Sequence, residues 1–209
     1  MTSDPVLYAA VLRLSRHDIK ALRITDAYSV HRVVYSLFTD TRDEEQKRAS
    51  HPSGILYADK GGDFRSRKIL LLANRLPNLA PPHGTVEYKP IPPHFLLHQQ
   101  YAFEVIINPT RRDHRSGKLV PVRNREAIAA WFAERAPVSW GFQVDDQRLQ
   151  VDRLTVQSFN KGNHTLTHGS AVVQGVLKVL DQQRFQESFC RGIGRGRAFG
   201  FGLLQIVPL

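Results

Sequence analysis

Residues 25–38 read TDAYSVHRVVYSLF, and this stretch predicts the first long helix of the chain. Thr25 or Asp26 can cap its N-terminus, because a short polar side chain there accepts hydrogen bonds from the first backbone amides of a helix. Apolar residues then recur at steps of three and four, which gives the helix one buried face. That face consists of Ala27, Val30, Val34, Leu37 and Phe38, with His31 beside it.

Strand patterns surround this helix in the first half of the chain. VLYAAVLRLS (6–15) precedes it and is rich in strand formers. The polar segment 41–54 reads as a loop. ILYADK (55–60) and KILLLANR (68–75) then predict two strands joined by a glycine-bearing turn, and GTVEYKPI (84–91) predicts another.

The second half repeats the order of a strand followed by a helix. Its expected elements are a strand at 100–110 (QYAFEVIINPT), a basic loop at 110–118 (TRRDHRSGK), a helix at 124–136 (NREAIAAWFAERA), antiparallel strands at 149–159 and 167–180, a short helix at 181–192 and a last strand at 201–209.

Each half therefore follows the pattern of a ferredoxin-like fold. We expect an α+β protein of two tandem ferredoxin-like domains, related to the RRM, with antiparallel sheets. The domains would span residues 1–92 and 98–209, and the proline-rich stretch 91–98 would connect them. The same elements also permit a single larger α+β domain.

The charge balance points to a polyanionic partner. The 209 residues carry 29 Lys and Arg against 19 Asp and Glu, a net charge of +10. Such a balance favours phosphate contacts, so nucleic acid is the first candidate partner. A structural protein of a ribosome-like particle, an anionic membrane surface, and a basic surface without a partner remain alternatives.

The composition also limits cofactors and location. Cys190 is the only cysteine, which excludes an internal disulfide and the usual thiolate metal sites, and the nine histidines lack a metal-ligand spacing. We therefore expect no metal and no cofactor. No apolar run has a membrane-spanning length and the N-terminus lacks signal-peptide features, so we expect a cytoplasmic protein with no membrane partner.

The segment GIGRGRAFGFG (192–202) holds five of the fourteen glycines. Glycine leaves backbone N–H groups open, so a phosphate can approach them closely. The fingerprint of a dinucleotide fold is excluded, because these glycines precede a terminal strand. Alternatively, the glycines only let a helix pack closely on a sheet. The candidate RNA-binding residues here are Arg191, Gly192, Gly194, Arg195, Arg197, Gly200 and Gly202.

Tyr28 and His31 lie three residues apart, on adjacent turns of one helix face. A neutral imidazole can take a proton from a ribose 2′-hydroxyl or return one to a leaving 5′-oxygen, and a nearby phenol can orient or donate. This pair can cleave RNA without a metal ion. The alternative is a half-buried histidine that packs near a core tyrosine.

Two further clusters can hold RNA. Arg111, Arg112, Arg115 and Lys118 form a basic run dense enough to follow a phosphate backbone, although such runs are usually solvated. Ser158 and Lys161 lie near a predicted hairpin turn, where a lysine can bind the scissile phosphate. Since the chain lacks an RNP-type aromatic pattern, a structured RNA is the better candidate.

Three ordered stretches resemble one known family, the CasE endoribonucleases of the type I-E Cascade system. They are GIGRGRAFGFGLLQIVP near the C-terminus, DAYSVHRVVYSLF near the N-terminus and INPTRR between them. The chain departs from the family pattern at Arg197, where relatives tend to carry lysine, and at Glu104 and Ile106, where they often carry arginines.

The resemblance implies an endoribonuclease that binds the hairpin of a CRISPR repeat and cuts at its 3′ base without metal. His31 would be the general acid and base and Tyr28 its partner. Attack by the 2′-hydroxyl would leave a 2′,3′-cyclic phosphate and a 5′-hydroxyl. The protein would then keep the product RNA and join the other Cascade subunits. The alternative is a non-catalytic RNA-binding subunit of the same superfamily.

Overall fold

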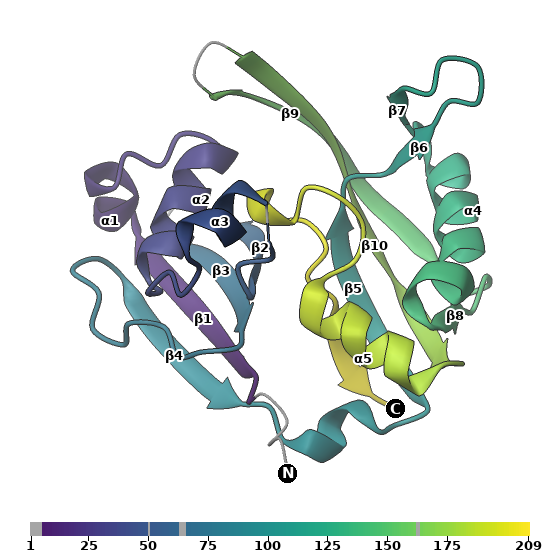
Figure 1. Cartoon of the computed structure of the whole chain (residues 1–209), viewed down its shortest axis with the longest axis horizontal. Coiled ribbons are helices and arrows are strands. Elements are labelled where there is room, and N and C mark those ends of the chain that lie inside the picture. The colour runs from purple at the N-terminus through teal and green to yellow at the C-terminus, as the bar shows by residue number, and fades with distance from the viewer. Residues whose placement is uncertain (1–5, 50, 63–65, 162–163) are drawn as a thin grey trace.

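The computed structural model describes residues 6–49, 51–62, 66–161 and 164–209 (Figure 1). For residues 156–161 and 164–168 it describes the backbone but not the side chains. Within these residues the chain forms two α+β units, each with its own antiparallel sheet. A short 3-10 helix, η1 (Pro93–Leu96), lies in the connection between them.

The first unit is a four-stranded sheet in the order β2-β3-β1-β4, covered by helices. Asp26 caps α2 by accepting a hydrogen bond of 2.8 Å from the backbone N of Ser29, and Val30 and Val34 are buried, as the sequence predicts. The elements of this unit are β1 (Tyr8–Ser15), α1 (Arg16–Ala21), α2 (Ala27–Ser36), α3 (Glu44–Arg48), β2 (Ile55–Gly62), β3 (Ser66–Ala73) and β4 (Thr85–Pro90).

The second unit has strand order β11-β5-β10-β8, with β9 also paired to β10. Its helices α4 and α5 lie over this sheet (Figure 1). The elements are β5 (Gln100–Ile107), β6 (Thr110–Arg112), β7 (Leu119–Pro121), α4 (Arg125–Arg135), the π-helix η2 (Ala136–Trp140), β8 (Phe142–Val144), β9 (Gln150–Lys161), β10 (His164–Val179), α5 (Gln182–Arg191), the 3-10 helix η3 (Arg197–Phe199) and β11 (Gln205–Pro208).

The strand orders confirm two ferredoxin-like units. In each unit the first strand and the strand before the last lie in the centre of the sheet, and the remaining strands lie at its edges. In the second unit a helix follows both central strands, whereas in the first unit residues 74–84, between β3 and β4, contain no helix.

The strands β2 and β3 are buried on both faces. One face contributes Tyr57 and Leu71 to a core with α2. The other face contributes Leu56 and Leu72 to the core of the second unit. This explains why both strands read as nearly continuous apolar runs instead of alternating ones.

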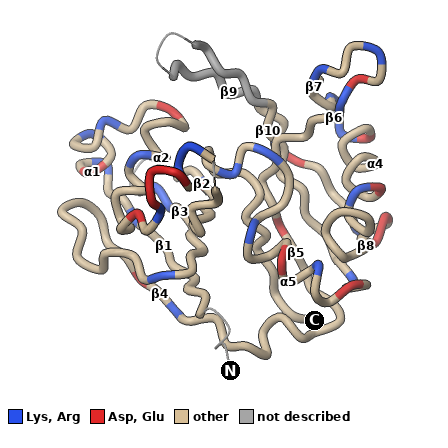
Figure 2. Tube along the Cα trace, viewed as in Figure 1, with Lys and Arg blue, Asp and Glu red and all other residues tan. Residues whose placement is uncertain are grey.

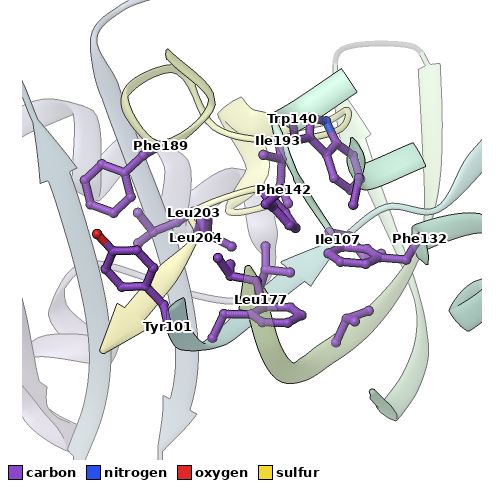
Figure 3. Packing of buried hydrophobic residues seen from close by; sticks show 14 of the residues in the cluster. Tyr101, Ile107, Phe132, Trp140, Phe142, Leu177, Phe189, Ile193, Leu203 and Leu204 are labelled. Carbon is purple, nitrogen blue, oxygen red and sulfur yellow. The ribbon is translucent and has the colours of Figure 1, made fainter. Parts of the chain in front are cut away.

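The two units therefore share one apolar cluster. Leu56, Ala58 and Leu72 belong to the same cluster as side chains of α5 and the C-terminal segment. Figure 3 shows this cluster from Phe189 and Tyr101 on one side to Phe132 on the other. Beside it, the Lys60 ammonium forms an ion pair with Glu104 of β5 and donates a hydrogen bond to Gln205 of β11. Glu104 thus joins the two units. In the family that the sequence resembles, this position often carries arginine.

Two sequence expectations need correction. The basic segment 110–118 is not simply a loop, because β6 and β7 pair as a hairpin whose turn is closed by the Asp113 carboxylate. The segment 41–54 contains the short helix α3, which begins at an N-cap, Asp43, that exchanges hydrogen bonds with Gln46. This capping box was readable in the sequence as Asp43-x-x-Gln46.

Candidate active site

His31 lies on α2 at the boundary with the second unit. Its imidazole is half-buried, and its Nδ1 is 2.6 Å from the backbone oxygen of Ala198 in η3. A carbonyl oxygen can only accept a hydrogen bond, so Nδ1 carries the proton. In the neutral ring this assigns the lone pair to Nε2, which is the nitrogen that can exchange a proton with a ligand.

A second donor holds the same carbonyl. The hydroxyl of Tyr57, on β2, donates a hydrogen bond of 3.0 Å to the oxygen of Ala198. Burial raises the pKa of Tyr57 above its ordinary value, so this hydroxyl stays protonated and remains a donor. The carbonyl that orients His31 is therefore itself fixed by a side chain from the core of the first unit.

Gly200 allows a close approach between the units, and Gly202 allows a close approach within the glycine-rich segment itself. Gly200 has φ +85°, and a Cβ there would lie 2.8 Å from Cε2 of Tyr57. Gly202 has φ +83°, and a Cβ there would lie 2.1 Å from the backbone oxygen of Ile193. Both residues are buried. Their burial favours the packing role for Gly200 and Gly202 over direct contact with RNA.

Three aromatic rings surround the imidazole of His31. The ring centroid of Tyr35 lies 4.1 Å away, that of Phe199 5.8 Å and that of Tyr28 6.1 Å. The Tyr28 ring is stacked nearly parallel to the imidazole, at an angle of 17°. Tyr28 and His31 are thus close together on one face of α2.

His31 opens onto a cavity of about 790 Å³ between the two units. Tyr35 lines this cavity, and its hydroxyl is 2.9 Å from Oγ of Ser53, whereas Tyr28 is not among the lining residues. The wall carries two groups of cationic side chains, one from the segment around α3 and one from the end of α5 and η3: Arg42 and Lys47, and Arg191 and Arg197. The cavity is thus a basic one with a histidine in its wall.

The glycine-rich segment divides its predicted residues between two cavities. Arg191 and Arg197 line the cavity of His31, and they also line a neighbouring cavity together with Gly192, Gly194 and Arg195. Arg197 is held in place by a hydrogen bond of 2.8 Å from its guanidinium to the backbone oxygen of Arg191. Figure 1 shows the glycine-rich segment, in yellow, running between the two units.

The predicted basic run lies apart from His31, on the hairpin of β6 and β7 (Figure 2). All four of its side chains are exposed: Arg111, Arg112, Arg115 and Lys118. Ser158 and Lys161 belong to β9, where they pair with Thr167 and His164 of β10, but their side chains lie outside the described residues.

Sequence reasoning missed three components of the site. Tyr35 was hidden among the apolar positions of the helix, Tyr57 lies within a strand, and Ala198 contributes only a backbone atom. The contacts of Ala198 with His31 and Tyr57 span 167 and 141 residues, so no local pattern could have indicated them. His51, which belongs to no motif described above, also lines the cavity.

No three His, Cys, Asp or Glu side chains among the described residues are grouped so that they could hold a metal ion. Of the helices in the part of the chain that the structure describes, none is long and apolar enough to cross a membrane.

Comparison with known sequences gives a family match over nearly the whole chain. Residues 7–208 match the family model described as CRISPR associated protein. A curated relative, the CRISPR-associated endoribonuclease Cse3 of Thermus thermophilus, is 30% identical over 130 residues. This match covers 57% of the chain and 61% of the relative, so the chain spans less than two thirds of that protein's length in the alignment.

Comparison with solved structures supports the fold. A structure of CRISPR endoribonuclease Cse3 bound to a 19-nucleotide RNA superposes with a TM-score of 0.77 and 22% identity, covering 97% of this chain and 100% of the other. A chain of a CRISPR RNA-guided surveillance complex superposes with a TM-score of 0.70 and 17% identity, again covering 97% of this chain and all of the other. The expected resemblance to CRISPR-associated proteins of the CasE type is confirmed.

Proposed function

Since the chain belongs to the CRISPR associated protein family, we propose that it is the endoribonuclease that cleaves the precursor of CRISPR RNA within each repeat. The observation that supports this most directly is the placement of His31, whose tautomer is assigned by Ala198, in the wall of a basic cavity. The hydrogen bond from Nδ1 makes Nε2 the basic nitrogen of the neutral ring, as proton transfer to and from a ligand requires.

In the proposed reaction, Nε2 of His31 takes the proton of a ribose 2′-hydroxyl while the 2′-oxygen bonds to the adjacent phosphorus. The bond from phosphorus to the 5′-oxygen breaks, and the protonated imidazole returns a proton to that oxygen. The products are a 2′,3′-cyclic phosphate and a 5′-hydroxyl. Because the nucleophile belongs to the substrate, positioning supplies much of the rate and no metal ion is required.

Neighbouring side chains have supporting roles in this proposal. Arg191 and Arg197 line the same cavity as His31 and can stabilise the charge that develops on the phosphoryl oxygens. Tyr28 is the second catalytic residue that the family resemblance implies, and its ring is stacked near the imidazole. Lys161 and Ser158 remain proposed phosphate contacts from β9.

The substrate we propose is the hairpin of the CRISPR repeat. The exposed arginines of the β6–β7 hairpin can contact its phosphates, and the net charge of +10 supports binding to a folded RNA. After cleavage the protein would keep the product and join the other Cascade subunits in the cytoplasm. The fold that it shares with a chain of a surveillance complex supports this assembly.

The central experiment incubates the protein with a repeat hairpin in EDTA and identifies the product ends. We expect a 2′,3′-cyclic phosphate, no cleavage of a substrate with a 2′-deoxy group at the scissile nucleotide, and a loss of at least a hundredfold in rate for His31→Ala. His17→Ala, which removes an exposed histidine from α1, is the matched control and should cleave normally.

Two outcomes distinguish the alternatives. If His31→Ala cleaves as fast as the unchanged protein, the assignment of His31 is wrong. If the unchanged protein binds the hairpin but never cleaves it, the non-catalytic RNA-binding subunit becomes the better description.

A further inference from the structure

A second cavity adjoins the candidate active site. It measures about 320 Å³ and shares Arg191 and Arg197 with the cavity of His31. Because the same two side chains line both cavities, the cavities are neighbours along one surface. A strand of RNA that leaves His31 in this direction would enter the second cavity next.

The wall of this second cavity is strongly cationic. Five arginines line it, and among its described lining residues Glu187 is the only acidic one. These arginines come from α4, from α5 and from the glycine-rich segment that follows it: Arg135, Arg184, Arg191, Arg195 and Arg197. Such a convergence of guanidinium groups selects an anionic ligand, and phosphate in particular.

The cavity also offers groups suited to a nucleobase. The guanidinium of Arg135 lies 5.7 Å from the ring centroid of Trp131, and the indole is partly exposed. Bases stack on aromatic rings and on guanidinium planes alike. Asn108 and Ser139 add polar side chains to the same wall.

A third cavity continues the surface toward the exposed arginines of the second unit. It measures about 880 Å³, shares Trp131, Arg135 and Ser139 with the second cavity, and reaches Arg111 and Arg112 on β6. The three cavities therefore form one basic track from His31 to the β6–β7 hairpin.

We propose that the second cavity holds one unpaired nucleotide of the bound RNA, with its base on the pair of Trp131 and Arg135 and its phosphate on the neighbouring arginines. This inference rests on the proposed function, because it takes the RNA strand at His31 as the strand that continues along the track. The occupied nucleotide belongs to a single-stranded flank of the repeat hairpin. The volume of the second cavity suits one nucleotide at a time.

The test measures RNA binding in the His31→Ala background, where cleavage is expected to be at least a hundredfold slower. Arg135→Ala is compared with Arg148→Ala, which removes an equal charge from an exposed arginine outside the three cavities. Three RNAs are used: a hairpin with both flanks, one without the 5′ flank and one without the 3′ flank. Arg195→Ala serves as a second cavity variant, and thermal melting checks that each variant is folded.

We expect Arg135→Ala to weaken binding of the fully flanked RNA about fivefold or more relative to Arg148→Ala, as loss of base stacking predicts. This difference in affinity between the two variants should vanish when the flank that supplies the bound nucleotide is removed. For Arg195→Ala, the logarithm of the RNA-binding constant should depend less steeply on the logarithm of the salt concentration. The magnitude of that slope should fall by about 0.7, the value for one phosphate contact to a single strand.

Equal binding by the Arg135 and Arg148 variants, or a loss that persists on both truncated RNAs, would overturn the nucleotide site. A loss that persists in this way would mean that Arg135 contacts the duplex. If the His31→Ala protein binds none of the three RNAs, the proposed function itself fails. If an acidic protein partner of the surveillance complex occupies the cavity instead, all three RNAs will bind the Arg135 and Arg148 variants equally.

Discussion

Ala198 has an inert side chain, but its backbone supplies the oxygen on which the proposed role of His31 depends. Its backbone oxygen accepts hydrogen bonds from both His31 and Tyr57, so the tautomer of the imidazole depends on where the backbone runs. A substitution of Ala198 by another small residue keeps this oxygen, whereas a change at Tyr57 removes one of its two donors. The useful probe of the arrangement is therefore Tyr57.

We predict that Tyr57→Phe lowers the cleavage rate several-fold and leaves hairpin affinity unchanged, because it loosens the carbonyl that orients His31 without touching the basic cavity wall. Stability should fall by about 1 kcal/mol, the usual net value of one hydrogen bond. Single-turnover cleavage, RNA titration and urea unfolding measure the three quantities. Tyr88→Phe, at an exposed tyrosine of β4, is the control. An unchanged single-turnover rate would show that the Tyr57 hydroxyl has no positioning role.

Gly200 offers a second test at the residue scale. Gly200→Ala and Gly194→Ala both place a side chain at positive φ, +85° and +73°, which costs about 1–2 kcal/mol each. Only at Gly200 would the new Cβ meet a ring, that of Tyr57, whereas nothing lies within 4 Å at Gly194. We therefore expect Gly200→Ala to be less stable than Gly194→Ala by a further 1–3 kcal/mol, roughly the cost of overpacking. Equal losses in urea unfolding would contradict this packing.

At this scale the sequence indicated Tyr28 and His31 as candidate catalytic residues, because both project from one predicted helix face. It did not indicate Tyr57 or Ala198 as residues of the site. Their importance comes from contacts between distant parts of the chain, and a backbone oxygen leaves no residue type to recognise.

At the scale of elements, the basic hairpin of β6 and β7 is the main surprise. The sequence predicted a loop there, because TRRDHRSGK has few strand formers and contains a turn-like Ser-Gly pair. The hairpin forms because Asp113 closes the turn, its carboxylate accepting hydrogen bonds from the backbone N and the hydroxyl of Ser116, each of 2.7 Å. Its strands are only three residues long, which is too short for an alternation of apolar and polar residues to be recognised in the sequence.

This turn gives a prediction for pH. Hydrogen bonds from the backbone and then the side chain of Ser116 hold the pKa of Asp113 below its ordinary value of 3.8. The turn is therefore stabilised above the ordinary pKa, and this stabilisation is lost as the pH falls through the lowered pKa. In an NMR titration the amide of Ser116 should titrate with a midpoint below 3.8. In Asp113→Asn, which removes the titrating carboxyl group, this transition of the Ser116 amide should be absent. A midpoint for Ser116 at or above 3.8 would mean that the turn does not form in solution.

The helices and longer strands were predictable for a simple reason. A helix such as α2 buries one face, so its apolar residues recur in the sequence at steps of three and four. For β2 and β3 the sequence indicated strands but not how they pack, because a strand buried on both faces shows no alternation. That the second face of this sheet belongs to the other half of the chain became visible only in the structure.

At the scale of the whole molecule, we propose the two units at residues 1–92 and 98–209 as domains that fold as one body. The apolar cluster that they share contains side chains from both, and the ion pair of Lys60 with Glu104 lies beside it. Separate domains with a small interface unfold in separate steps, whereas units with a common core unfold together.

We predict a single cooperative unfolding transition in urea, coincident by fluorescence and circular dichroism. In a double-mutant cycle, Lys60→Met with Glu104→Gln should show a coupling energy of about 1 kcal/mol, because each side chain is only about 30% exposed. The corresponding cycle of Arg13→Met with Glu87→Gln, at an exposed pair within the first sheet, should show a coupling energy of a few tenths of a kcal/mol. Two separate transitions, or equal coupling at both pairs, would contradict a shared core.

The close fit of Gly200 against Tyr57 also limits how this chain can evolve. A larger residue at position 200 needs a smaller one at position 57, and that change removes the hydroxyl that holds Ala198. Recombination that joins the first half of one relative to the second half of another separates side chains that were selected together. We expect such hybrids to keep their two sheets and to lose the hydrogen bond that orients His31, so each half needs the matching other half.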